Sequence, residues 1–255
     1  MLDEVTHAGH HPEEDENYFV SMTDMMVGVL FIFIILLMVF ALTFRSHTDR
    51  TDEQVKQLEQ TKETAKTVAT KLEQLQQAID ADIQAIQAAE SVRSQLLHQI
   101  QERLAQQHLT VDIDDSTGVV HLTDAAILFA PDQYQLNALD TANVTTIASV
   151  LAEVLPAYLN PDAGRAAYLE TVFIEGHTDE TGIKDRNWDL SARRAVQTFL
   201  GLRDAQPGLV ALRNHDGSPI FSVSGYADTR PMPNTNASEY DKQRRIDLRF
   251  VMNTD

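Results

Sequence analysis

An uncharged run of twenty residues, 25–44, is the feature of this sequence that most constrains its fold. Eighteen of the twenty side chains are apolar, and fourteen are Val, Leu, Ile or Phe. A helix of that length spans roughly 30 Å, about the thickness of the hydrocarbon core of a bilayer. The tail over residues 1–17 holds six acidic side chains and no Lys or Arg, whereas a cleaved signal peptide needs a basic start. We therefore expect a retained transmembrane helix over residues 18–45.

Asp24 lies just before the apolar run, inside the expected helix. Ser21, Asp24 and Gly28 follow the helical spacing of three and four, so polar and small groups share one stripe. A carboxylate in a membrane helix costs roughly 2.5 to 3.5 kcal/mol, and such acids usually line ion or proton paths. One span cannot enclose a pore, so we expect Asp24, with Ser21 and Thr23, to carry ions against helices of a channel partner. An Asp that caps the helix at the water interface is the alternative.

Charge and composition limit the other functions that this chain can have. With 20 basic and 38 acidic side chains the net charge is −18, which argues against direct binding of nucleic acid. The chain has no cysteine, which excludes disulfides, thiolate metal sites and cysteine nucleophiles. Arg45 and Arg50 follow the apolar run, and by the positive-inside tendency they favour a cytoplasmic C-terminal part. The resemblance described below favours the opposite orientation.

Residues 46–108 contain no Gly and no Pro and predict one long helical spacer, about 90 Å long over sixty residues. Apolar and small side chains recur in it at intervals of three and four, with one shift of phase near residue 83. With Lys62 as a polar member of the series, they are Val55, Leu58, Ala65, Ala69, Leu72, Leu75, Ile79, Ile83 and Ile86, and then Leu97, Ile100 and Leu104. This weak seam favours a dimeric coiled coil; a single solvated helix, or packing on a partner, is the alternative.

Residues 109–255 have the composition of a globular α+β domain. Alternating residues around Asp115–Gly118 predict a hairpin, and hydrophobic periodicity predicts two helices and three further strands. The expected hairpin strands are 110–114 and 118–122, the helices 139–155 and 190–202, and the remaining strands 171–175, 220–226 and 246–251.

One loop between a strand and a helix carries the candidate site. The strand ends at Gly176 and delivers Asp179 to a loop, and the expected helix starts near Ser191, which can cap it, with Arg194 in its first turn. An acid and a guanidinium brought together there suit a zwitterionic amino-acid head, because the acid can bind the ammonium group and the Arg the carboxylate. An ordinary Asp–Arg ion pair is the alternative.

The segment 124–251 closely resembles the OmpA/MotB C-terminal peptidoglycan-binding family. The resemblance rests on Gly-His-Thr-Asp at 176–179, on Leu-Ser-Ala-Arg-Arg-Ala at 190–195, and on Leu128-Phe129, Asn187, Ser224-Gly225-Tyr226 and Arg244-Arg245-Ile246-Asp247-Leu248. It implies a βαβαββ domain in which Asp179 and Arg194 contact the diaminopimelate of the cell-wall peptide. Thr178, Asn187 and Arg245 would surround the pocket. Gln243 departs from the Asn that the family often has before the Arg pair.

An acidic tail, one span with an acid, a spacer and this domain together resemble the B subunit of a MotAB-type stator. The segment around Asp24 is most similar to ZorB of the Zorya anti-phage defence system. That resemblance implies a proton-driven, or alternatively sodium-driven, motor in the bacterial inner membrane, with a cytoplasmic N-terminus and a periplasmic C-terminal domain. Its partners would be peptidoglycan, a second copy of this chain, a multi-span MotA-like (ZorA-like) subunit and, indirectly, ZorC-like and ZorD-like effectors.

Two rival functions remain: a passive tether between membrane and cell wall, and a flagellar-type stator subunit. We expect no enzymatic activity and no cofactor, because Ser191, His177 and Asp179 lack the context of a nucleophile elbow. His177 and Asp179 lack a third metal ligand nearby in the sequence, which argues against a metal site.

Overall fold

The computed structural model describes residues 13–123, 125–160, 167–232 and 239–253, with side chains from Met22 onward. The chain divides into two units, residues 1–76 and 77–255. The part of the expected acidic tail before residue 13 lies outside the described residues.

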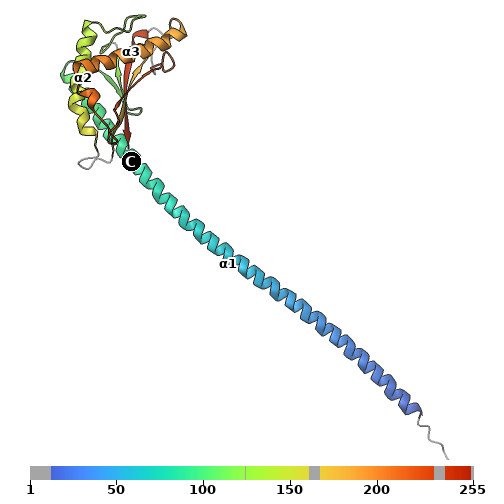
Figure 1. Cartoon of the computed structure of the whole chain (residues 1–255). Coiled ribbons are helices and arrows are strands. Elements are labelled where there is room, and N and C mark those ends of the chain that lie inside the picture. The colour runs from blue at the N-terminus through green and yellow to red at the C-terminus, as the bar shows by residue number, and fades with distance from the viewer. Residues whose placement is uncertain (1–12, 124, 161–166, 233–238, 254–255) are drawn as a thin grey trace, which may run out of the picture. The chain divides into compact units, whose positions relative to one another are not determined.

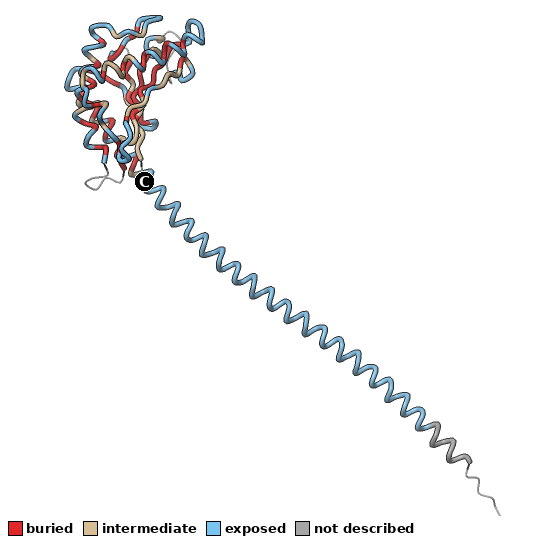
Figure 2. Tube along the Cα trace, viewed as in Figure 1, coloured by how far each residue is buried: buried red, intermediate tan, exposed pale blue. Residues whose placement is uncertain are grey.

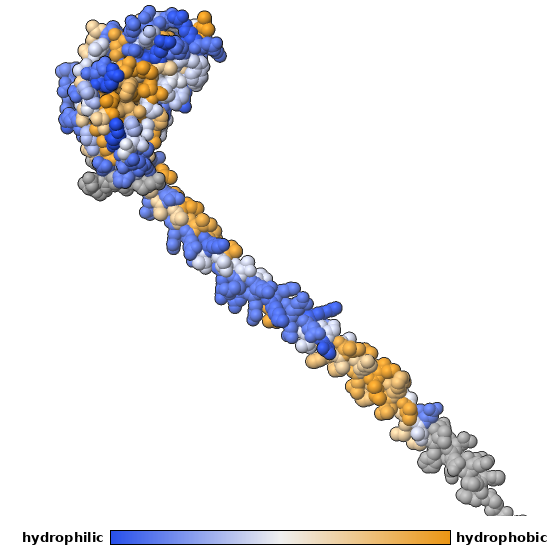
Figure 3. Space-filling view, viewed as in Figure 1, coloured by the Kyte–Doolittle hydropathy of each residue, from blue (hydrophilic) through white to orange (hydrophobic). Residues whose placement is uncertain are grey.

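The N-terminal unit consists of helix α1, which spans Glu13–Gln106 and continues into the second unit. From Met22 onward α1 contains a window with a mean hydropathy of 3.2, none of which is buried in the single chain. Figure 3 shows this apolar stretch as a continuous orange surface on the helix. The length and composition of the segment fit a membrane span, as the sequence predicts. A second apolar helical segment, Ala138–Tyr158, is also long enough to cross a membrane, but 44% of its most apolar stretch is buried in the C-terminal unit.

The C-terminal unit is a five-stranded sheet with helices packed on it, in which the strand order is β1-β2-β5-β3-β4. β3 and β4 are parallel and the other neighbouring strands antiparallel. The strands are β1 (Asp112–Asp114), β2 (Val119–Leu122), β3 (Tyr168–Gly176), β4 (Phe221–Gly225) and β5 (Ile246–Asn253). The helices are α2 (Ala138–Val154), α3 (Lys184–Ala205) and α4 (Tyr240–Gln243), with short 3₁₀ turns at Leu155–Tyr158 and Leu209–Ala211.

This arrangement confirms the mixed α+β class. Both strands of the hairpin join the sheet, so the order of the domain is ββαβαββ, with one strand more at its start than βαβαββ. Each strand and helix named from the sequence is present. The main difference is α3, which begins at Lys184 rather than at Leu190. Ser191 is therefore inside the helix and does not cap it.

Alternate residues of β2, β3 and β5 face the core, and α2 and α3 lie against that face of the sheet (Figure 1). Val120, Val172, Ile174, Leu248 and Phe250 belong to one buried cluster with side chains of both helices. The intervening residues face the other side of the sheet. Several of those are charged, and they form the network described below.

The last four turns of α1 are part of the same core. Leu96, Leu97, Ile100 and Leu104 are at most 1% exposed and belong to the buried cluster of the domain. In Figure 2 this end of α1 changes from exposed to buried. Three residues of the predicted coiled-coil seam, Leu97, Ile100 and Leu104, are thus used within the domain and cannot contact a second copy. Residues from Gln77 onward, which include the last part of the predicted spacer, belong to the C-terminal unit.

Candidate functional site

The candidate site lies beyond the carboxyl ends of the two parallel strands. After β3 ends at Gly176, the chain stays attached to the sheet, since the His177 amide donates to the Arg245 carbonyl (3.0 Å) and the Thr178 amide to the Ala227 carbonyl (2.9 Å). These two bonds hold Asp179 at the edge where β3 and β4 end and α3 begins.

Two paired glycines let α3 approach that edge closely. Gly176 and Gly225 are neighbours in the β3–β4 register. A Cβ on Gly176 would collide with the carbonyl oxygen of Ser191, and one on Gly225 would lie 2.7 Å from the Ser191 hydroxyl. That hydroxyl donates to the Trp188 carbonyl and accepts from the Ala227 amide, each at 3.0 Å. Ser191 thus fixes α3 to the loop after β4.

The loop and α3 form a pocket of about 380 Å³ at this edge. Three guanidinium groups and two carboxylates are among its lining groups, which makes the lining net positive in a chain of net charge −18. The lining residues are Pro131, Asp132, Thr178, Asp179, Thr181, Gly182, Ile183, Arg186, Asn187, Leu190, Arg194 and Arg244. Four of the five residues predicted for peptidoglycan binding are therefore brought together here.

Arg194 is fully buried at the base of the pocket. It donates to the carbonyls of Gln133 (2.9 Å), Ala130 (3.2 Å) and His177 (3.4 Å), and it stacks 5.1 Å from the ring centre of Phe129. Burial, and then the charge of Arg244, lower the pKa of Arg194 to about 10, so it remains protonated at neutral pH. A guanidinium has five N–H donors, and the described contacts use three. The others can donate to a ligand carboxylate.

Asp179 is held by its own loop and by an arginine that the sequence analysis did not assign to the pocket. Its carboxylate accepts from the Thr181 amide (2.9 Å) and hydroxyl, and from Arg244 Nη1 (2.8 Å). Burial raises the pKa of Asp179, but the hydrogen bonds from Thr181 and Arg244 outweigh it and leave the pKa below its ordinary value. Asp179 is therefore a carboxylate at neutral pH and can bind a ligand ammonium group.

Asn187 and Thr178 have different parts in the pocket. The Asn187 side chain donates to the carbonyls of Thr181 (3.0 Å) and Asp179 (3.3 Å), which braces the loop. The Thr178 hydroxyl and Arg244 Nε are buried and have no hydrogen-bond partner among the described residues. Buried polar groups are normally paired, so these two atoms are candidates for contact with a ligand.

Arg245 does not line the pocket, contrary to the prediction. It is 4% exposed and its Nε donates to both oxygens of Asp247, at 2.9 and 3.1 Å. The register explains the error: consecutive residues at the start of a strand point to opposite sides. Arg244 therefore reaches Asp179, while Arg245 reaches the sheet face that α2 and α3 do not cover.

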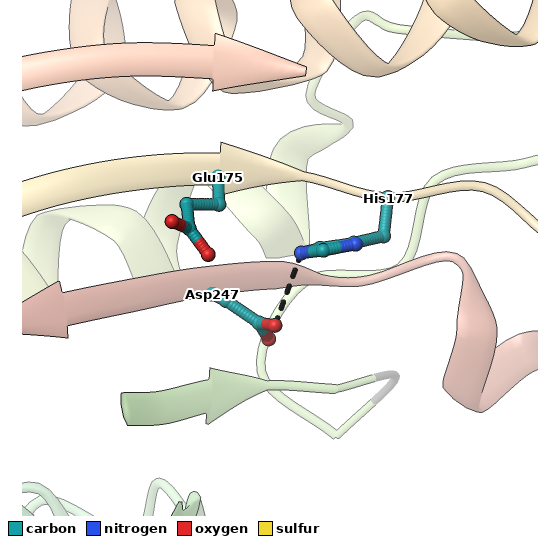
Figure 4. Close-up of side chains that lie close together, drawn as sticks. All are labelled: Glu175, His177 and Asp247. Carbon is teal, nitrogen blue, oxygen red and sulfur yellow. Dashed lines mark ion pairs between the residues drawn. The ribbon is translucent and has the colours of Figure 1, made fainter. Parts of the chain in front are cut away.

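That face carries a buried charged network (Figure 4). Asp247 lies 2.7 Å from His121 Nδ1 and 3.0 Å from His177 Nε2, and Arg249 donates to Glu175 at 2.8 and 2.9 Å. Burial lowers the pKa of His177, while Asp247 partly opposes that effect.

Glu175, His177 and Asp247 each bring a potential ligand atom within 4.8 Å of one another, a spacing that could hold a metal ion. Both carboxylates already contact arginines, however, and a cation would have to displace them. The network therefore fits a structural role. The metal pair considered from the sequence is not formed, because His177 faces Asp247 while Asp179 contacts Thr181 and Arg244.

The predicted ion-translocating residues lie on α1, in the other unit. Thr23 and Asp24 are in the helix and exposed in the single chain. The side chain of Ser21 lies outside the described set.

Three charged residues of the pocket were not assigned to it from the sequence: Asp132, Arg186 and Arg244. Arg186 was detectable in principle, because it shares a helical stripe with Leu190 and Arg194 at intervals of four. Asp132 is 47 residues before Asp179 in the sequence and reaches the pocket through the fold.

The chain is similar to several known proteins. Residues 128–245 match the model of the OmpA family. A Bacillus subtilis protein described as "Uncharacterized protein YtxE" is 27% identical over 169 residues, which cover 62% of this chain and 60% of that protein's length.

Among solved structures, the cell wall anchor of the T6SS from Pseudomonas aeruginosa is 21% identical, covers 60% of this chain and 94% of its own, and has a TM-score of 0.41. A putative MotB like protein from Desulfovibrio vulgaris is 18% identical, covers 67% and 96%, and has a TM-score of 0.44. The periplasmic domain of Helicobacter pylori MotB is also 18% identical, covers 54% and 76%, and has a TM-score of 0.36. The family match spans α2, α3 and the whole pocket edge, so the C-terminal domain of this chain is OmpA-like.

Proposed function

We propose that the C-terminal domain binds the stem peptide of peptidoglycan in the pocket formed by Asp179, Arg194 and Arg244. The observation on which this depends is the buried carboxylate that shares the pocket lining with two guanidinium groups and with Thr178, whose buried hydroxyl has no hydrogen-bond partner among the described residues. Such a set matches a diaminopimelate head: Asp179 binds its ammonium group, and Arg194 and Arg244 bind its carboxylate. The match to the OmpA family over the same residues supports the assignment.

The test is a pull-down of the full chain, in detergent, with purified sacculi. Asp179→Asn removes the charge that binds the ammonium group, and we expect at least about a tenfold loss of retained protein, since a buried charged contact contributes on the order of 1.5 to 3 kcal/mol. Asp204→Asn, an exposed change at the end of α3, is the matched control and should bind normally. Fluorescence of the single Trp188 must show that both variants unfold like the wild type. Normal retention of folded Asp179→Asn would refute the proposal.

We further propose that the chain is a single-pass protein of the bacterial inner membrane, with the N-terminus in the cytoplasm and the OmpA-like domain in the periplasm. The apolar segment of α1 supports the span, and the binding of a wall polymer supports the orientation. Arg45 and Arg50, which follow the span, do not outweigh this support for a periplasmic domain, because long domains cross the membrane largely regardless of flanking charge.

In this setting Asp24 is the ion-carrying group of a MotAB-like motor, with Ser21 and Thr23 beside it. Two copies of the chain stand within a multi-span MotA-like (ZorA-like) subunit, and protonation of Asp24 changes its contact with the surrounding helices. One unit charge crossing 100 mV releases about 2.3 kcal/mol, enough to drive a conformational step. By its resemblance to Zorya, the motor signals to ZorC-like and ZorD-like effectors during phage infection.

Asp24→Asn tests the motor directly. The variant should insert and bind sacculi normally but lose both proton conductance and protection against phage, because an amide group does not take up and release a proton as a carboxylate does. Asp49→Asn, on the same helix beyond the apolar run, is the control and should keep both activities. Full conductance and protection with Asn at position 24 would leave the passive tether, in which Asp24 only caps the helix. Sodium in place of protons is distinguished by removing each ion in turn.

A further inference from the structure

A second charge pair lies at the pocket, in addition to Asp179 and Arg244. Arg186, in the first turn of α3, donates through Nε to one oxygen of Asp132 and through Nη2 to the other. Asp132 comes from the loop before α2, 54 residues earlier in the sequence, with a backbone φ of +64° that Asp tolerates better than most residues. Both residues line the pocket.

The two pairs differ in how tightly they are held. The side chains of Arg244 and Asp179 are 13% and 8% exposed, whereas those of Arg186 and Asp132 are 57% and 55% exposed. An exposed ion pair contributes about 1 kcal/mol or less, so a ligand can replace it at little cost. The Nε and Nη2 of Arg186 therefore form a fork of two donors that can bind an anion, and the Asp132 carboxylate of the same chain occupies this fork.

We propose that Arg186 is a specificity-determining residue that binds a second ligand carboxylate, and that Asp132 is the internal competitor which this carboxylate displaces. The inference rests on the proposed peptidoglycan binding and names the ligand more closely. The ligand is a stem peptide whose last residue has a free main-chain carboxylate. The zwitterionic head of the same residue's side chain is held by Asp179 and Arg194.

The charges of the pocket favour a ligand of this kind. Asp179 already pairs with Arg244 within the chain, and the charges of Asp179 and Asp132 both act on Arg194. A ligand that brought one ammonium and one carboxylate would leave the positive excess of the pocket unchanged. A second carboxylate neutralises that excess and takes both N–H groups of the Arg186 fork in the bidentate geometry that guanidinium prefers.

The test uses one peptide in two forms, a tripeptide ending in diaminopimelate with its main-chain carboxylate either free or amidated. The zwitterionic head is the same in both. With the full chain in detergent, calorimetry should show that the wild type binds the free acid about threefold to tenfold more tightly than the amide. Arg186→Gln should lose this preference by weakening the acid alone. Asp132→Asn should have the opposite effect and bind the acid more tightly than the wild type does.

The opposite signs separate this inference from a structural role of the pair. If the pair only tethers the loop to α3, both variants weaken the two peptides equally, and the inference is wrong. It is also wrong if Arg186→Gln still prefers the acid. Arg203→Gln, which removes an exposed arginine from the last turn of the same helix, is the control and should keep wild-type affinities. If the wild type binds neither peptide nor sacculi, the proposed function itself fails.

Discussion

Asp114 closes the β1–β2 hairpin with its carboxylate. It accepts from the amide and hydroxyl of Ser116 (3.0 and 2.6 Å) and from those of Thr117 (3.3 and 2.7 Å). These bonds, the side-chain bonds from Ser116 and Thr117 first among them, lower the pKa of Asp114 from 3.8 to about 2. This acidic turn residue thus stabilises the hairpin more when it is ionised than when it is protonated.

Replacement of Asp114 by Ala should therefore have a pH-dependent cost. Because the folded pKa is below the unfolded one, the stabilisation is complete above about pH 4 and is lost as pH falls through 2. Because solvent screens this partly exposed group, we expect the loss of stability on replacing Asp114 to be about 1 kcal/mol at pH 6. Unfolding by urea, followed by Trp188 fluorescence at pH 6 and pH 2.5, measures it. Asp112→Ala, on the exposed strand two residues earlier, is the control; an equal cost of Asp114→Ala at both pH values would contradict the explanation.

For single residues, the sequence predicted which side chains near Asp179 form the site better than it predicted which of two neighbouring side chains faces the pocket. Asp179, Thr178, Asn187 and Arg194 could be found because they lie within seventeen residues on one loop and one helix. Arg244 and Arg245 are adjacent, and which of them faces the pocket depends on where β5 starts. That is a property of strand pairing rather than of the local sequence.

Among the elements, α3 depends most on its contact with the sheet. Its first residue has no side-chain cap, and its position is set where Ser191 meets Gly176 and Gly225. Asp179 lies on the loop and Arg194 on the helix, and the two side chains reach the same pocket because this contact is so close. The close approach connects the packing of one helix directly to the geometry of the binding site.

We predict that Gly176→Ala destabilises the domain by at least about 3 kcal/mol, since its methyl group would overlap backbone rather than a flexible side chain. Gly208→Ala is the matched control: nothing lies within 4 Å of its added Cβ, so stability should change by less than about 1 kcal/mol. Thermal unfolding of both variants, with sacculus binding measured below the transition, provides the check. A stable Gly176→Ala variant that still binds would show that close packing does not position the site.

In the whole molecule, α1 has two environments. From Leu96 to Leu104 its apolar side chains belong to the domain core, whereas those from Val55 to Ile86 are exposed in the single chain. The first group stabilises the C-terminal unit. The second remains available for a second copy of this chain, as the dimer hypothesis requires.

Two substitutions should separate these roles. Ile79→Lys places a charge in the exposed seam and should convert a dimer in detergent into a monomer, while the domain unfolds as before. Leu97→Ala should leave the dimer intact and destabilise the domain by about 2 to 5 kcal/mol. Sedimentation in detergent and Trp188 fluorescence measure the two effects, with Gln77→Lys as the control for charge. A wild-type chain that sediments as a monomer would contradict the dimer hypothesis.

The sequence by itself determined the features that depend on local composition and period: the apolar span, the unbroken helix that follows it, the α+β class, and the loop with Asp179 and Arg194. The tertiary structure decided those that depend on which distant segments meet. It buried the end of α1 in the domain, turned Arg244 toward Asp179 and Arg245 away from it, and brought Asp132 to Arg186. The reason is physical, because periodicity records the faces of an element, whereas packing and strand register determine what each face contacts.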